Sequence, residues 1–350
     1  MPMLTPHCLR TSTFGFLAAC LMTGLYSCGG ERTYDVPASA YDHVVPEAVN
    51  VRSLMRQAAA NGLKSWQAQT GEFGMAYTED ILRIGAGDDP TTLLEFERFL
   101  SHPDVAPIEA AIDTTSGLPE RLAQHEVTLR QAFQRFHHWF PDDELPQVAW
   151  MNSGFNYAVY PMPGYLGVGL EWFLGTEHPI VQTLAPNMFP QYMRNRMQPD
   201  RVPTSAFRGW LLVHFSQPWY RTERCVDEML FWGKAMFILE QCMPDAPKAA
   251  LFDWSEAEWQ WAREHERDVW IELQPQDVLF ESDRTRFGKW FTEGPFTRYG
   301  AIPQDSPDRL GVYMGWRMVS DYMDRHPEIA LADLMQVTDI NPVIKAYRPE

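Results

Sequence analysis

The spacing closest to a catalytic pattern lies in the segment WLLVHFSQPWYR, which runs from Trp210 to Arg221. A zinc-binding helix needs two histidines four positions apart, because this spacing brings two imidazoles to one ion. It also needs a glutamate beside the first histidine to polarise the metal-bound water. Here His214 holds the first position, but Phe215 replaces the glutamate and Pro218 replaces the second histidine. We therefore interpret His214 as a hydrogen-bonded core residue, and the segment predicts no metal site.

Other patterns for metal binding or nucleophilic catalysis are weaker. His137 and His138 are adjacent, so on a helix their side chains point about 100° apart. The sequence contains no Cys-x-x-Cys, no Gly-x-Ser-x-Gly and no Walker phosphate-binding loop. Among many carboxylates, Asp227 and Glu228 form the most suggestive pair, because they fall in a predicted long helix near His214. No cofactor is predicted.

Two glycines near the C-terminus provide a second candidate feature. Gly311 and Gly315 are four residues apart and share one helix face, next to Trp316. Each costs about 1 kcal/mol relative to alanine in a helix, a cost that close approach of another helix or a ligand can offset. We favour helix packing. The alternative is the floor of a cleft that would combine these three residues with Glu228.

Helices must position most of these side chains. Residues 117–139 repeat apolar side chains at intervals of three and four, as an amphipathic helix does. Residues 223–242 predict a long, broadly apolar helix. Ser255 is a predicted N-cap of a helix rich in charge and tryptophan. Near the C-terminus, Ser306 is predicted as N-cap with Pro307 at the first helical position.

Residues 145–173 depart from this helical pattern. The stretches QVAWM, NYAVY and YLGVGLEWF alternate or are rich in β-formers, and proline and glycine separate them. They predict two to four short strands in a small sheet. The expected fold class is therefore α+β and mostly helical. Apolar residues make up 45% of the chain, which suits a single well-filled domain over residues 49–350.

The N-terminus predicts export and lipid anchoring. Residues 1–27 carry one charge and the apolar run FGFLAACLMTGLYS, the proportions of a secretory signal peptide. The run ends in LYSC, which is similar to the lipobox of bacterial lipoproteins, so we expect cleavage before Cys28 and acylation of that residue, with palmitate as a suitable label. Residues 28–48 are rich in proline, glycine, serine and charge, and predict a flexible tether.

Charge and cysteine content exclude several classes of protein. A net charge of −17 argues against nucleic acid as a partner and against docking on anionic lipid. Cys225 and Cys242 lie in one predicted helix, where a rise of about 1.5 Å per residue places them too far apart for a disulfide. We predict two free, mostly buried thiols.

Taken together, these features resemble the gliding-motility lipoprotein family GldB. The similar stretches are YLGVGLEWFLG, FPQYMRNRM, MLFWGKAMF, DVWIELQPQDVLFESD and, most specifically, GPFTRYGAIPQDSPDRLGVYMGWRMVSDYM. That family in turn looks like a relative of zinc peptidases with the zincin fold. The resemblance places the degenerate metal-site positions at His214, Phe215, Pro218 and Trp232, of which only the histidine is retained. It implies a zincin-like fold with a small mixed β-sheet and a lost metal site.

The resemblance also implies a function. We expect a non-enzymatic, lipid-anchored protein of the cell envelope that supports gliding motility or associated protein secretion by binding envelope proteins of that machinery. Gly29 after the acylated cysteine gives no inner-membrane retention signal, which favours the outer membrane. Two alternatives stay open. One is a zinc metallopeptidase with displaced ligands, such as His214 with Glu228, and the other is a glycan-binding lipoprotein that uses surface tryptophans.

Overall fold

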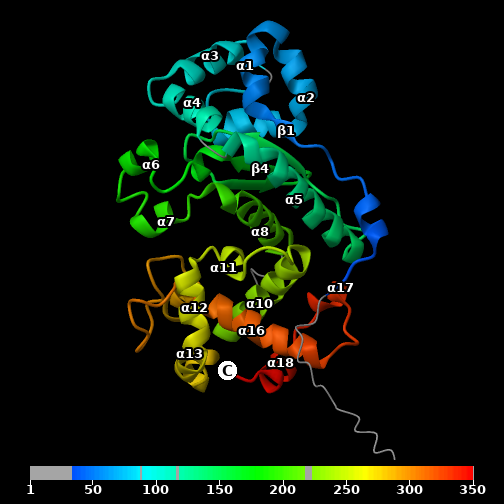
Figure 1. Ribbon diagram of the computed structural model, residues 1–350, viewed down its shortest axis with the longest axis vertical. Helices are drawn as coiled ribbons and strands as arrows, with labels where there is room; N and C mark the ends of the chain where they lie inside the picture. The colour runs from blue at the N-terminus through cyan, green and yellow to red at the C-terminus, as the bar shows by residue number, and fades with distance from the viewer. Residues whose placement is uncertain (1–33, 87–88, 116–117, 217–222, 350) are drawn as a thin grey trace, which may run out of the picture. The chain divides into compact units, whose positions relative to one another are not determined.

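The computed structural model describes residues 34–86, 89–115, 118–216 and 223–349, which form a mostly helical fold with one small sheet (Figure 1). The sheet has the strand order β1-β2-β4-β3, in which β1, β2 and β4 pair in parallel and β3 runs antiparallel to β4. This mixed sheet within a helical fold confirms the α+β prediction. The strands are β1 (Val49–Asn50), β2 (Gln147–Met151), β3 (Val159–Met162) and β4 (Tyr165–Gly169).

The helices cover both faces of the sheet and build the C-terminal half of the chain.

Within the described ranges, no helix is both long enough and apolar enough to cross a membrane. The helices are α1 (Val51–Asn61), α2 (Leu63–Ala76), α3 (Thr92–Ser101), α4 (Ala106–Thr114), α5 (Leu118–Trp139), α6 (Pro179–Thr183), α7 (Gln191–Asn195), α8 (Val202–His214), α10 (Cys225–Cys242), α11 (Lys248–Leu251), α12 (Glu256–Glu264), α13 (Glu266–Leu273), α14 (Gln276–Leu279), α15 (Arg284–Phe287), α16 (Leu310–Arg325), α17 (Leu331–Leu334) and α18 (Ile340–Ala346).

The sheet separates two hydrophobic cores. Successive side chains on a strand point to opposite faces. In β2, Val148 and Trp150 therefore join a large core with α5 and α8, whereas Ala149 and Met151 join a smaller core with α1 and α2. Figure 1 shows α8 below the sheet and α1 and α2 above it. Helices on both faces hold the sheet in place, and α8 packs against one of these faces.

Helices α10 and α16 form the centre of the C-terminal half, and glycines let them approach closely. A Cβ on Gly315 would lie 2.1 Å from the Met229 carbonyl oxygen of α10. A Cβ on Gly233 would lie 2.2 Å from the Gly315 carbonyl oxygen. Gly311 instead packs against Trp290 and Phe291. The structure thus supports the packing interpretation of the two α16 glycines, and no open groove floor lies at either one.

The start of α16 differs from the sequence prediction. The helix begins at Leu310 rather than after Ser306, and its N-cap residue is Arg309, which has a left-handed backbone with φ 54°. The Leu310 N–H is satisfied by the Thr297 hydroxyl at 3.1 Å. The prediction of Ser306 as N-cap was wrong because a side chain thirteen residues earlier in the chain supplies the cap.

The predicted tether is shorter than expected, because residues 34–48 are bound to α5. The buried Arg135 guanidinium donates to the Tyr34 carbonyl at 2.9 Å and to the Tyr41 hydroxyl at 2.9 Å. The Gln134 amide donates to the backbone carbonyls of Tyr41 and His43. Residues 28–33 of the predicted tether, Cys28 among them, lie outside the described residues together with the signal peptide.

Cys225 and Cys242 are free and buried, as predicted. They lie at the two ends of α10, so the helix itself holds their sulfurs apart. Burial raises the pKa of Cys225 to about 12 and also raises the pKa of Cys242. Since a thiolate is the reactive form of cysteine, these thiols are unreactive at neutral pH.

Candidate functional site

His214 is the last residue of α8 and makes a hydrogen bond, as the sequence predicted. Its Nε2 lies 2.9 Å from an Asp143 carboxylate oxygen. Its ring stacks on Trp210 at 4.9 Å and meets the edge of Phe136 of α5 at 5.4 Å. The side chain is 24% exposed, so it lies at the margin of the core rather than in its centre. These contacts point the imidazole towards α5.

The other degenerate metal-site positions do not complete a metal site with His214. Phe215 meets the His214 ring at 4.9 Å and packs on Phe140, the residue after α5, at 5.6 Å. Trp232 lies on α10 and lines a separate hollow. Pro218 lies outside the described residues. In the part of the chain that the structure describes, no three His, Cys, Asp or Glu side chains are grouped so that they could hold a metal ion.

The residues of the predicted cleft, Glu228, Gly311, Gly315 and Trp316, do not line one common hollow in the described part of the chain. Glu228 is fully buried and accepts a hydrogen bond from Arg284 at 2.8 Å, at the wall of a hollow of about 350 Å³ that Trp232 shares. Burial raises the pKa of the Glu228 carboxyl, and Arg284 partly offsets this. Trp316 is buried and donates to Glu240 at 2.7 Å. Of the four predicted residues, only Glu228 borders a hollow described here.

A different cavity, of about 420 Å³, lies between α8 and the antiparallel edge strand β3. The face of α8 that lines it carries Ser205, Arg208, Gly209 and Leu212, which follow helical spacing. A Cβ on Gly209 would lie 2.8 Å from a Val159 methyl group, so this glycine lets the helix approach the strand closely. His214 is not among the lining residues. The cavity therefore lies on a different face of α8 from the one that carries His214.

One wall of this cavity is apolar. It consists of aromatic, thioether and branched side chains. They come from β3, from α8, and from the chain between β4 and α8, which includes α7. Thioethers adapt to ligands of different shapes, so the wall suits a large apolar side chain rather than one specific group. The residues are Val159, Trp172, Phe173, Met193, Met197 and Leu212.

Another part of the cavity lining is charged. Arg208 pairs with Asp253 at 3.2 Å and donates to the Leu251 carbonyl at 2.9 Å. Burial alone would raise the pKa of Asp253, but Arg208 and Arg309 outweigh it and hold that pKa below its usual value. Burial lowers the pKa of the Arg208 guanidinium. The pair is therefore ionised at neutral pH and forms a charged part of the lining, beside the apolar wall.

The backbone of β3 adds hydrogen-bonding groups beside the cavity. Gly169 N–H donates to the Ala158 carbonyl at 2.9 Å, and Val159 is opposite Val168 in the register. Because bonded and non-bonded pairs alternate in an antiparallel ladder, the N–H and C=O of Val159 point away from β4. Proline at position 161 has no N–H and limits this open edge to a short stretch.

A buried carboxylate, which the sequence analysis missed, supports the rim of the cavity. Glu171 Oε1 accepts hydrogen bonds from the N–H groups of Ser153 at 2.9 Å and Phe155 at 3.1 Å. Burial raises the pKa of this carboxyl to about 7. The loop that it holds leads directly into Asn156 and Tyr157, which line the cavity. A glutamate at the end of an apolar strand is the only sequence signal for this role.

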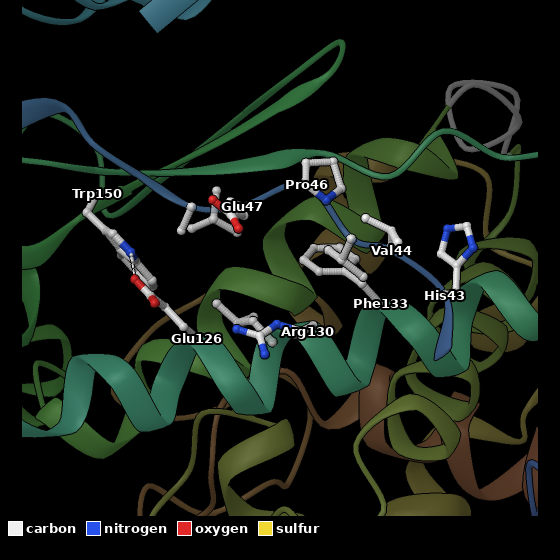
Figure 2. A pocket seen from close by; sticks show the side chains of 12 residues that line it. His43, Val44, Pro46, Glu47, Glu126, Arg130, Phe133 and Trp150 are labelled. Atoms are coloured by element: carbon white, nitrogen blue, oxygen red, sulfur yellow. Dashed lines mark hydrogen bonds between the residues drawn. The ribbon is translucent and has the colours of Figure 1, made fainter. Parts of the chain in front are cut away.

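Another hollow, of about 500 Å³, lies between the docked N-terminal segment, α5 and β2. Figure 2 shows residues 43–48 crossing above α5, with Arg130 projecting between them. Trp150 Nε1 donates to Glu126 at 2.8 Å on one side of it. Its charged lining residues have both signs, with Glu47 and Glu126 facing one arginine. This hollow exists only because the N-terminal segment is docked.

Comparison with known proteins gives one match. The family model described as "Gliding motility protein GldB" matches residues 43–349, which is most of the chain and includes both cores and the cavity. No curated protein and no solved structure matches the chain.

Proposed function

The chain belongs to the GldB family of gliding motility proteins, and from this premise we propose that it supports gliding motility, or the protein secretion associated with it, by binding a partner rather than by catalysis. The partner is a protein of the cell envelope. We propose that its extended segment binds in the cavity between β3 and α8.

We propose that the chain is a lipid-anchored protein of the envelope, which the lipoprotein label of the matching family supports. We propose Cys28 as the acylated residue and the outer membrane as the location, since Gly29 gives no retention signal. Labelled palmitate should appear in the protein and disappear in Cys28→Ser. An unlabelled, freely soluble wild-type protein would contradict the anchor.

We further propose that the fold is zincin-like in outline and lacks peptidase chemistry. Support comes from helix α8 below a mixed sheet whose edge strand is antiparallel. The metallopeptidase alternative needs His214 and Glu228 at one site. His214 instead contacts Asp143, and Glu228 contacts Arg284. Zinc retained at one ion per chain, and lost in His214→Ala, would favour the peptidase.

The observation that carries the proposal is the open edge of β3 beside a cavity with an apolar wall and a charged pair in its lining. An extended peptide can add its backbone to such an edge, while one of its side chains enters the cavity. The glycan-binding alternative relied on surface tryptophans, and no tryptophan is among the exposed large apolar side chains of the described residues.

A variant that fills the cavity tests the proposal. Ser205 lines the cavity from α8 and is only partly buried, so Ser205→Phe places a ring in the cavity without removing a core side chain. We expect loss of crosslinked envelope partners and of gliding, with the unfolding temperature little changed. Gln191→Phe, on the exposed start of α7, serves as the control. Normal partner recovery in Ser205→Phe would refute the binding site.

A further inference from the structure

Two further hollows lie near the cavity between β3 and α8. Glu293 lines both the cavity and a neighbouring hollow of about 320 Å³. Lys289 and Thr292 line that hollow and also the hollow of about 350 Å³ at Glu228. Because each shares lining residues with the next, the three hollows are neighbours, and we call them together the trough. It runs from the open edge of β3 to α15.

The two hollows beyond the β3–α8 cavity carry positive charge that no carboxylate of the described residues neutralises. Lys289 and Arg298 line them and are exposed, and within the described ranges neither makes an ion pair. Arg298 lies over the Phe296 ring at 5.4 Å. The two carboxylates in these hollows are engaged, Glu228 with Arg284 at 2.8 Å and Glu293 with Arg309 at 3.6 Å. Lys289 and Arg298 therefore leave positive charge on this surface of a chain whose net charge is −17.

We propose that the trough binds an extended, acidic segment of a partner protein. One large apolar side chain of the segment enters the cavity, its backbone pairs with the open edge of β3, and its carboxylates lie against Lys289 and Arg298. This inference rests on the proposed function and specifies the chemistry of the partner. The strand edge and the side-chain cavity favour a peptide over an anionic glycan, which offers neither a β-backbone nor an apolar side chain.

Charge explains why an acidic segment would choose this surface. The rest of a strongly negative protein repels carboxylates, so the trough is a local exception that steers an acidic segment to one place. Two exposed charge contacts together change affinity by roughly tenfold, and this gain weakens as salt rises.

Peptides of matched length test the inference. Three fluorescent peptides share a central phenylalanine and differ in their flanks, which are glutamate, glutamine or lysine. We expect the glutamate peptide to bind roughly tenfold more tightly than the glutamine peptide at low salt, with the difference shrinking at high salt. Equal binding of all three would overturn the acidic inference and leave the proposed function standing. Binding of none, with no partner lost in Ser205→Phe, would refute both.

Charge reversal provides the second measurement. In the double variant Lys289→Glu/Arg298→Glu, we expect the glutamate peptide to lose its advantage and the lysine peptide to gain affinity. The matched control is Lys64→Glu/Arg267→Glu, which changes the same net charge at exposed positions that do not line the trough. An equal effect in the control would overturn the site. Binding of polygalacturonate in place of the peptides would replace the partner with a glycan.

Discussion

At the residue scale, the charge of the neighbouring groups decides how the buried carboxylates of this protein behave. Asp253 and Glu171 both lie near the same cavity. The first is held ionised by arginines, whereas the second has only neutral donors around it, so burial raises its pKa to about 7. Glu171 therefore couples the rim of the cavity to pH in the neutral range.

This coupling predicts a pH dependence of stability. The pKa of Glu171 is about 7 in the folded protein and 4.5 in an ordinary environment, so the folded state binds more protons between these values. Its contribution is present below pH 4.5 and is lost as pH rises through 7, by about 3 kcal/mol in total. Glu171→Gln should remove this loss, as urea unfolding across the range would measure.

The control for this measurement is Glu97→Gln, an exposed carboxylate on α3. Subtracting each variant from wild type cancels the titration of the other carboxyl groups. If the unfolding free energy of Glu171→Gln follows pH as steeply as that of wild type and Glu97→Gln, the elevated pKa is refuted.

At the element scale, the contact between α10 and α16 shows why two helices rich in large side chains still pack closely. Gly233 and Gly315 face each other, and each leaves room for the backbone of the opposite helix. The same glycines look like weak points in the sequence, because glycine lowers helix propensity. The cost to each helix is offset by the shared contact.

Gly315→Ala should therefore be strongly destabilising. Its Cβ would lie 2.1 Å from the Met229 carbonyl oxygen, a backbone atom that cannot move without shifting α10. We expect the free energy of unfolding to fall by about 2–4 kcal/mol, as overpacking does. Gly288→Ala is the matched control, because its φ is −55° and its Cβ meets only the Arg284 side chain at 3.6 Å.

The control should be neutral or stabilising by about 0.5 kcal/mol, since alanine reduces the entropy of the unfolded chain. Equal unfolding midpoints for the two variants in chemical denaturation would show that α10 and α16 do not pack as described.

At the scale of the whole molecule, docking of residues 34–48 changes how far an anchor at Cys28 lets the body reach. Tyr34 is pinned to Arg135, and only six residue steps separate it from Cys28. At about 3.5 Å per step, the body stays within roughly 20 Å of the anchor. Without docking as far as Tyr41, the reach would grow to roughly 45 Å.

Energy transfer to acceptors in the bilayer measures this reach. His138→Cys places a label on the exposed end of α5, and the buried Cys225 and Cys242 should not react. We expect strong transfer in lipidated protein and weaker transfer when Arg135→Leu releases the segment. Arg121→Leu, a change to an exposed arginine near the other end of the same helix, should leave transfer unaltered. Equal transfer in all three would contradict a docked segment that restrains the body.

Local features were predictable wherever neighbours in sequence decide them. Apolar periodicity predicted α5 and α10, and Ser255 is the N-cap as predicted, with Glu258 completing a capping box. Alternation predicted the strands within residues 145–173, although the two-residue strand β1 was missed because it is too short to alternate. The cavity was not predicted. His214 faces α5, whereas other residues of α8 line the cavity.

The family, the α+β class, several long helices and the free cysteines followed from the sequence, because short stretches of neighbouring residues are enough for each. The packing of distant segments was needed to show that Arg208 meets Asp253, that Arg135 holds Tyr34, and that three hollows share Glu293 and Lys289. The first two pairs are separated by 45 and 101 residues, and the hollows are lined by separate segments of the chain. Such pairings depend on how whole elements pack, and no local pattern of side chains encodes them.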